Sequence, residues 1–410
     1  MKNFKRKALI FGLLIGSMSI VACGGGNNGG GNGNSGDSDA GNSGETAKGP
    51  WTVKFDTNGG NETYEDQIVE NKGLVQNPGT PTRVDPVKGA YTFDEWRSDD
   101  GGAWSFTATK VTKNVTLIAH WIARYAVSYK DESGALIGET TYVNEGDPLT
   151  APANPTAPAG KVFYGWQNTN NGGQIWDYTN VTLNQVMDDV EFKPLFVSEG
   201  DPQIFEAEEC PDYLDEAWGS KGMPGNTYSG GNNGLALISQ DFYDETGKNK
   251  YGASGDYTVN GSHFAAFAHF LYVKNDRLTW ELESDAPATN VTMIMRLSAE
   301  YGLLNSDNGD TTSWVDDTTF PITVNGEKLQ YGKITFHNII PMLFIPFQDY
   351  YVSATISLNQ GTNIIQMKTD NTVTINGTIA SSAPVVDCIK LYSSSNLTWP
   401  NACPDNLESI

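Results

Sequence analysis

An internal repeat constrains this chain more than any other feature of its sequence. Four short segments of residues 51–121 recur in the same order in residues 122–198, about 70 to 75 residues further on. Apolar and polar residues alternate in each segment, which is the period of a half-buried strand, and turn-forming Gly, Pro and Asn lie between the segments. The matched pairs are Val53–Phe55 with Val127–Tyr129, Tyr91–Trp96 with Val162–Trp166, Trp104–Phe106 with Trp176–Tyr178, and Val115–Leu117 with Val190–Phe192. We therefore predict two small β domains whose Trp residues fill their cores.

The first copy resembles the Listeria–Bacteroides repeat, also called the internalin B-repeat. The resemblance rests on Val53–Gly60, Pro81–Arg83, Tyr91–Trp96 and Lys113–Trp121. It implies a compact β-grasp-like unit that serves as a spacer or a weak adhesive unit on a surface protein. The second copy departs from the family pattern, because Asp131–Gly134 replaces the Asn-Gly-Gly turn and Phe196 replaces the closing Trp.

Residues 203–393 differ from the repeats in their sequence pattern and predict a third domain. Strand-like segments recur without any helix-length amphipathic pattern, and about ten strands in a span of this size are typical of a β-sandwich or jelly roll. The clearest are Arg277–Leu282, Val291–Ser298, Phe320–Val324, Ala354–Leu358, Ile364–Met367 and Val385–Leu391. The expected fold class is mostly β, with two small β-grasp-like repeats followed by a sandwich and a C-terminal tail over residues 394–410.

Three carboxylates at the two ends of this third domain form a candidate metal site. Glu206 and Glu208 are two residues apart, so on a strand they share a face and can converge on one hard cation. Asp387, in the last predicted strand, is the candidate third ligand. Acidic pairs on an acidic chain are commonly just solvent-facing, and the residues alone leave both interpretations open.

The same domain resembles the carbohydrate-binding modules of families 6 and 35. The resemblance rests on the order of Phe205–Glu208, Tyr228–Gly231, Arg277–Leu282, Ala286–Leu297, Val324–Glu327, Ser357–Ile365 and Val385–Leu391. It implies a structural Ca²⁺ held by Glu206, Glu208 and Asp387, and non-catalytic binding of a glycan or polysaccharide by loops at one end of the sandwich. By position, the residues that would contact the sugar are Tyr228, Asn232, Trp314, Tyr350 and Asn376. Trp314 ranks first because it lies among polar residues in an acidic loop.

The sequence does not favour an enzyme. It contains four His, none at metalloprotease spacing, and no nucleophile elbow or phosphate-binding loop. The net charge of −23 argues against nucleic acid and against anionic lipid surfaces as partners. The alternative to glycan binding is an adhesin that grips a host or neighbour-cell protein through the repeats, with the sandwich as a structural domain.

The N-terminus predicts export and lipid anchoring. Four basic residues precede an apolar stretch over residues 8–22, and small residues stand directly before Cys23. We interpret residues 1–22 as a lipoprotein signal peptide, Cys23 as the lipidated residue, and residues 23–50 as a flexible Gly-, Asn- and Ser-rich tether on the extracellular face of the membrane. An ordinary secretory signal or an uncleaved anchor is the alternative. Cys210, Cys388 and Cys403 then allow one disulfide of undetermined pairing.

Overall fold

The computed structural model describes the main β domains of the chain. The described residues are 49–210, 214–215, 220–221, 235–238, 252, 257–259, 262–268, 271, 274–299, 313–337, 346–370, 373–375, 378–380 and 383–402. Every regular element in these ranges is a strand, which confirms the mostly-β prediction. No helix in the described part of the chain is long and apolar enough to cross a membrane.

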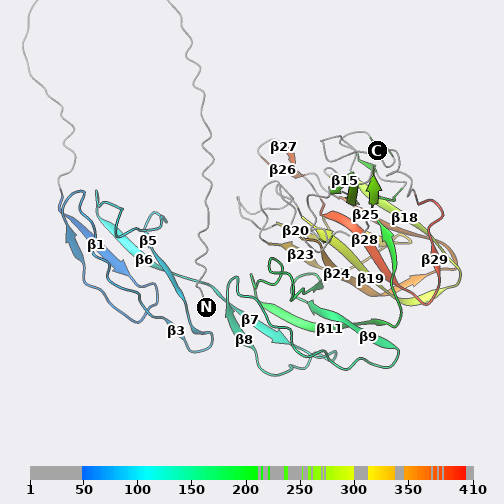
Figure 1. Ribbon diagram of the computed structural model, residues 1–410, viewed down its shortest axis with the longest axis horizontal. Helices are drawn as coiled ribbons and strands as arrows, with labels where there is room; N and C mark the ends of the chain where they lie inside the picture. The colour runs from blue at the N-terminus through cyan, green and yellow to red at the C-terminus, as the bar shows by residue number, and fades with distance from the viewer. Residues whose placement is uncertain are drawn as a thin grey trace, which may run out of the picture. The chain divides into compact units, whose positions relative to one another are not determined.

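The first repeat is a four-stranded sheet with one parallel pair. Its order is β2 (Gln67–Val69), β1 (Trp51–Asp56), β6 (Val115–Trp121) and β5 (Phe93–Ser98) (Figure 1). Strands β1 and β6 are parallel and the other pairs are antiparallel. A small hairpin, β3 (Val84–Asp85) with β4 (Gly89–Ala90), lies between β2 and β5 in the sequence. Trp96 and Trp121 are buried in its core, as the repeat pattern predicts.

The second repeat reproduces this topology. Its strands follow the order β8 (Thr141–Asn144), β7 (Arg124–Tyr129), β11 (Val190–Ser198) and β9 (Lys161–Asn168), with β7 parallel to β11. Trp166, Trp176 and Phe192 form its core. The short strand β10 (Gln174–Ile175) is added beyond β9. The two copies are therefore one fold, despite their different turns.

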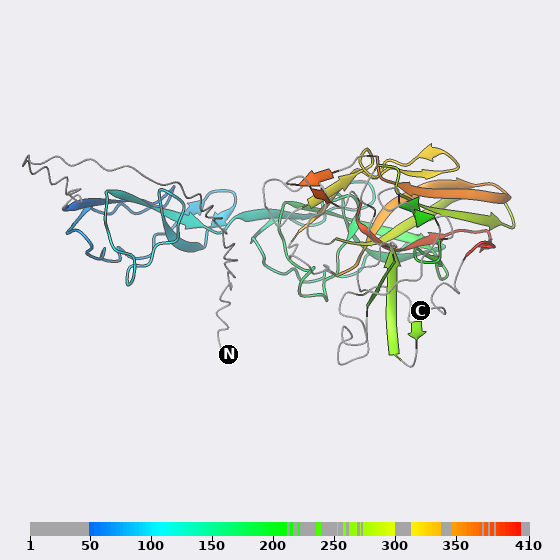
Figure 2. The same ribbon diagram turned by 90° about the horizontal axis from the view of Figure 1, so that it is seen from above.

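The C-terminal domain is a sandwich of two sheets. The first contains β12 (Gln203–Glu206), β15 (Leu235–Ile238), β16 (Tyr257–Val259), β17 (Ser262–Ala268), β28 (Val385–Tyr392), β19 (Ala288–Ser298) and β24 (Gln348–Leu358). The second contains β14 (Ser220–Lys221), β13 (Leu214–Asp215), β18 (Arg277–Ser284), β29 (Leu397–Thr398), β25 (Gly361–Lys368), β21 (Ile322–Val324) and β22 (Glu327–Lys328). Two ribbons complete it, β20 (Ser313–Asp316) with β23 (Lys333–Phe336) and β26 (Val373–Ile375) with β27 (Thr378–Ala380). Figure 2 shows the strands of the two sheets from above.

Strand β19 is covered on both of its faces. Met293, Met295 and Leu297 point into the core between the two sheets, where they join Trp280. Ile294 points the other way and packs with apolar side chains of the second repeat. A strand covered on both faces buries consecutive residues instead of alternate ones, which explains why every residue of Val291–Met295 is buried, Thr292 included.

The second repeat and the sandwich share one sheet. Gln174 of β10 pairs with Tyr350 of β24, so a sheet of 12 strands runs from the sandwich into the repeat (Figure 1). Leu195 and Val197 of β11 pack with Ile294 and Tyr392 of the sandwich. We call this contact between residues 122–198 and the sandwich the seam. The second repeat is thus docked on the sandwich through a shared sheet and apolar contacts.

Candidate functional site

The opening and closing strands of the sandwich lie side by side. β12 is antiparallel to β28 with Glu206 opposite Cys388, and the N–H of Ala207 donates to the carbonyl of Asp387 over 2.8 Å. A carboxylate oxygen of Glu206, one of Asp387 and the Cys388 Sγ all lie within 4.8 Å of one another. Two of the three predicted metal ligands are therefore neighbours.

Glu208 departs from the prediction. β12 ends at Glu206, so Glu208 lies in the following turn and does not share a strand face with it. The Glu208 side chain is 1% exposed, but it is not part of the three-residue cluster, in which the thiol of Cys388 takes the third place. Calcium prefers oxygen ligands, so the two carboxylates fit the ion and the thiol does not.

Arg296 supplies a positive charge beside the same cluster. Its Nε lies 3.3 Å from Oδ2 of Asp387, which is fully buried. Burial by itself would lower the pKa of Arg296, but Asp349 and Asp387 outweigh it and the pKa is raised, so the guanidinium remains charged. An ion at Glu206 and Asp387 would therefore share Asp387 with an existing cation.

Asp349 is the centre of a charge cluster at the seam. It accepts hydrogen bonds from Arg296 Nη1 at 2.8 Å, from Lys390 Nζ at 2.8 Å and from the Tyr164 hydroxyl of the second repeat at 2.5 Å. Burial would raise the pKa of Asp349, yet Arg296 and Lys390 hold it below its usual value. Burial and the nearby Asp349 charge raise the pKa of Tyr164, so its hydroxyl stays a donor. The cluster thus fastens the repeat to the sandwich.

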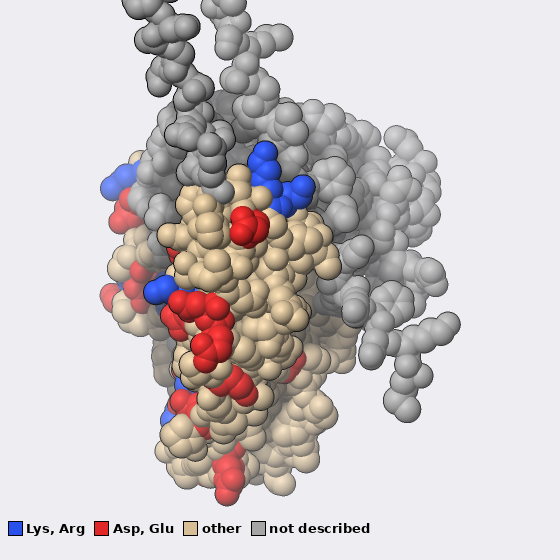
Figure 3. Space-filling model, turned by 90° about the vertical axis from the view of Figure 1, so that its left-hand side faces the viewer, with Lys and Arg blue, Asp and Glu red and all other residues tan. Residues whose placement is uncertain are grey.

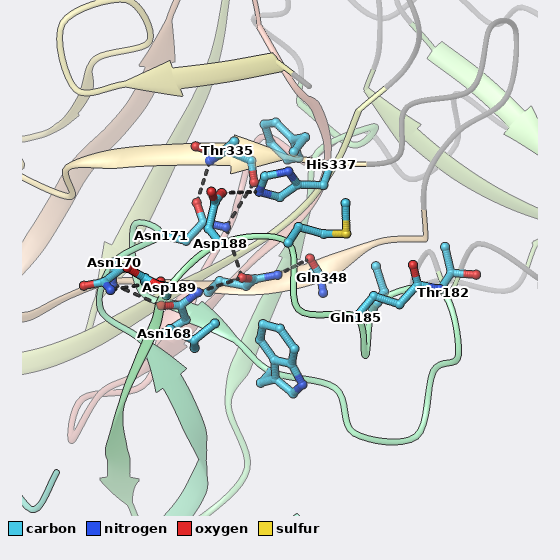
Figure 4. A pocket seen from close by; sticks show the side chains of 16 residues that line it. Asn168, Asn170, Asn171, Thr182, Gln185, Asp188, Asp189, Thr335, His337 and Gln348 are labelled. Atoms are coloured by element: carbon cyan, nitrogen blue, oxygen red, sulfur yellow. Dashed lines mark hydrogen bonds and ion pairs between the residues drawn. The ribbon is translucent and has the colours of Figure 1, made fainter. Parts of the chain in front are cut away.

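A chain of amide side chains forms a second fastening at the seam (Figure 4). The Asn171 side chain donates to the carbonyl of Thr335 over 3.0 Å and accepts from the Thr335 N–H over 2.6 Å, as a strand partner would. Gln174 Nε2 donates to Gln348 Oε1 over 2.9 Å. At the edge of this network, His337 Nε2 lies 3.0 Å from Asp188 Oδ2. A small cavity of about 70 Å³ lies among these residues.

Two glycines allow the close approach of the two domains. Gly172 and Gly173 have φ values of 53° and 71°, in the left-handed region that glycine tolerates. A Cβ on Gly173 would lie 2.6 Å from the carbonyl oxygen of Tyr351, and one on Gly172 would lie 2.5 Å from Cγ1 of Ile334. The Gly173 carbonyl instead accepts a hydrogen bond of 2.9 Å from the N–H of Tyr351. Only glycine fits at these positions without displacing the sandwich strands.

A larger pocket lies beside the amide network and shares Trp176 and Gln348 with the small cavity. We call this the seam pocket; its volume is about 550 Å³. Aromatic rings from both domains line it, together with a few polar groups that include Arg296, Asp349 and Asp177. The aromatic lining residues are Phe163, Tyr164, Trp166, Trp176, Tyr178 and Phe347. Sequence reasoning misses this pocket, because the repeat pattern assigns most of the repeat residues in it to the core.

The structure places two of the predicted sugar contacts. Trp314 lies on strand β20 and not in a loop, and it is half-buried with Lys333 Nζ 4.6 Å from its ring centre. Tyr350 corrects the prediction: β24 begins at Gln348, so Tyr350 is a strand residue, and it is 1% exposed with its hydroxyl bonded to Gln348 Oε1. A covered ring cannot stack on a sugar. Tyr228, Asn232, Asn376 and Cys23 lie outside the described residues.

Two further features of the described residues concern charge and redox state. On the face shown in Figure 3, acidic side chains form several groups and basic ones are sparse, in keeping with the acidic composition. Cys210 and Cys388 are both buried, and no disulfide joins these two residues. Cys403 lies outside the described residues.

Comparison with known proteins supports the repeat assignment. The family model of the Listeria–Bacteroides repeat domain matches residues 51–120 and 125–188. Both copies therefore match one family. A relative from Evansella cellulosilytica, whose name describes it as a membrane protein, is 32% identical over 140 residues, which are 33% of this chain and 20% of that protein. The chain thus spans about a fifth of the length of that relative.

Among solved structures, the matches include carbohydrate-binding modules. A family 35 module from Clostridium thermocellum is 16% identical with a TM-score of 0.24, over 48% of this chain and all of that one. A family 35 module of Cellvibrio japonicus Abf62 is 14% identical with a TM-score of 0.22, over 37% of this chain and 84% of that one. Because these TM-scores are low, the description of the sandwich rests on its own strand order and residues.

Proposed function

We propose that this protein is an exported surface protein that binds a glycan without cleaving it, and that its sandwich is the binding domain. The observation that carries the proposal is the pairing of β12 with β28, which brings Glu206 next to Asp387. The sequence motifs predict this neighbourhood from positions about 180 residues apart. A lipid on Cys23 would hold the protein on the extracellular face of the membrane, with residues 23–50 as the tether.

The test of glycan binding uses the whole exported chain, because the second repeat is docked on the sandwich. The protein is applied to a glycan array and to insoluble polysaccharides, with and without calcium. Trp314→Ala should strongly reduce retention while the protein stays folded, since the ring is only half-buried. Trp104→Ala, which removes a half-buried ring of the first repeat, is the matched control. Equal retention of the two variants on every glycan would contradict the assignment of Trp314.

A structural calcium ion is part of the same proposal. Glu206 and Asp387 would hold it, and it would stabilise the folded state by about 2.7 kcal/mol at a hundredfold excess over its dissociation constant. Chelation should then lower the melting temperature of the wild type by several degrees, and added calcium should restore it. Asp387→Asn should show no such response. An identical chelator effect in both proteins, or none in either, would refute the ion.

The adhesin alternative has one specific observation in its favour. On the first repeat, Ile68, Val84 and Val87 are 68%, 62% and 69% exposed, and Ile68 lies on the edge strand β2. Exposed apolar side chains near an open strand edge are suited to a protein partner. If that role is correct, Ile68→Lys together with Val87→Lys should reduce adhesion to target cells and leave retention on polysaccharide unchanged.

A further inference from the structure

We propose that the seam pocket is a binding site for a neutral saccharide, formed jointly by the second repeat and the sandwich. The site is distinct from Trp314 and from the loops that the family resemblance implicates, and it does not depend on the glycan function proposed above. Its volume of about 550 Å³ lies within the range of roughly 300–1,000 Å³ that is common for small-molecule sites.

Two buried hydrogen-bond donors point to a ligand with oxygen acceptors. Among the described residues, Trp166 Nε1 and Gln348 Nε2 have no hydrogen-bond partner, although both side chains line the pocket and are only 4% and 5% exposed. The Gln348 amide is oriented by its other end, because Oε1 accepts from Gln174 and from Tyr350. A buried N–H without a partner costs free energy, and an oxygen of a ligand would relieve that cost.

The remaining lining explains why the ligand is a sugar and why it is neutral. Phe163 and Tyr178 are half-buried rings, and aromatic faces of this kind pack against the C–H groups of a pyranose. The pocket also holds Arg296 and the carboxylates of Asp177 and Asp349, so the charged groups that line it carry both signs. Hydroxyl groups can accept from the N–H donors and donate to the carboxylates, whereas an anionic ligand would meet Asp177 and a cationic one would meet Arg296.

The site requires both domains. Trp166 lies on β9 of the second repeat and Gln348 on β24 of the sandwich, and the amide network together with Asp349 holds these strands in register. This arrangement gives the docking of the second repeat a function: the repeat supplies most of the aromatic rings, and the sandwich supplies the charged groups of Arg296 and Asp349. The same pocket would accept a free sugar or the terminal unit of a glycan chain, since both present the same hydroxyl groups.

The experiment measures binding of defined sugars to the whole chain by saturation-transfer NMR. The probes are methyl glycosides of glucose, galactose, mannose and xylose, their disaccharides, and glucuronic acid and glucosamine as charged counterparts. At least one neutral sugar should bind at millimolar concentration or below, and it should bind more tightly than its charged counterpart. Competition by a soluble polysaccharide then distinguishes a chain terminus from a free sugar as the source of the ligand.

Two variants and one control variant test the location. Ala151 lies exposed on the pocket and Ala153 is exposed but does not line it, so Ala151→Trp should weaken binding by at least about tenfold and Ala153→Trp should not change it. Gln348→Met removes the buried donor and should weaken binding about fivefold. Melting curves of Ala151→Trp and Gln348→Met show whether weaker binding reflects a loss of folding. The melting temperature of Ala151→Trp should equal that of the wild type.

Three results would overturn the proposal: no neutral sugar binds at millimolar concentration, Ala151→Trp behaves like Ala153→Trp, or a charged sugar binds more tightly than every neutral one. Failure here is separable from failure of the proposed function. Trp314→Ala should leave binding at the seam pocket intact, and Ala151→Trp should leave retention through Trp314 intact.

Discussion

Replacement of Asp349 by Asn tests whether the seam holds the second repeat on the sandwich. The carboxylate accepts from Arg296, Lys390 and Tyr164, and the side chains of Arg296 and Lys390 are only 21% and 15% exposed. The Asp349→Asn side chain would keep the shape and lose the charge, so two mostly desolvated cations would lose their shared anionic partner. Removing one partner of a buried ion pair costs about 3–5 kcal/mol.

The expected loss lies at the lower end of that range. Arg296 keeps Asp387 as a partner at 3.3 Å, and the amide oxygen of the variant can still accept one hydrogen bond, so we expect about 3 kcal/mol. For a domain of this size each kcal/mol shifts the melting temperature by about 2–4 °C, which gives a fall of about 6–12 °C. The measurement is differential scanning calorimetry of the whole chain at neutral pH.

A matched control and the pH dependence make the test specific. Asp370 pairs with Lys274 at 3.5 Å, but the side chains are 53% and 59% exposed, so Asp370→Asn should cost less than about 1 kcal/mol. Because the pKa of Asp349 is lowered in the folded state, its contribution is complete above the ordinary Asp pKa and is lost as the pH falls below it towards the folded value. Wild type and Asp349→Asn should therefore converge in acid. Equal melting temperatures of the two Asn variants at neutral pH would refute this account of the seam.

Two further predictions concern the seam glycines and the buried thiols. Gly173→Ala should destabilise the protein more than Gly160→Ala in equilibrium unfolding: both positions have a similar positive φ, 71° and 73°, but only the Cβ at Gly173 would meet the sandwich, so equal losses would show that the contact is unimportant. Cys210 and Cys388 should resist a thiol reagent in the native protein and react after denaturation, as read by mass spectrometry, and rapid native labelling would contradict their burial.

The repeats and the sandwich can be predicted from the sequence because their strands alternate or form isolated apolar runs. The seam cannot be predicted from the sequence, because each of its residues has an ordinary interpretation when it is taken alone. Asn171 and Gln174 look like ordinary loop polar residues, and Gly172-Gly173 looks like a turn. The consecutive apolar residues Met293–Met295 indicate a strand covered on both faces, but the sequence does not show what covers the second face.

The candidate site is predicted less well than the fold, because two of the expected strand boundaries are wrong. Starting β24 near Ser353 places Tyr350 in a loop, whereas the strand begins at Gln348 and turns that ring into the core. Extending β12 past Glu206 places Glu208 on a shared face that it does not have. Boundaries are the least certain part of a sequence-based strand assignment, and ligand positions inferred from alternation inherit that error.

The docked second repeat covers an apolar face of the sandwich and pairs with the edge of its strand β24. Ile294, at 0% exposure, and Tyr392, at 8%, are covered by Leu195 and Val197 of the repeat, so a fragment that begins after residue 198 would expose an apolar face. It would also lose the Tyr164 hydroxyl at Asp349, the amide partners of Thr335 and Gln348, and the β10 edge of β24. The second repeat is therefore packed as part of the sandwich, and the spacer role implied by the repeat family stays a prediction.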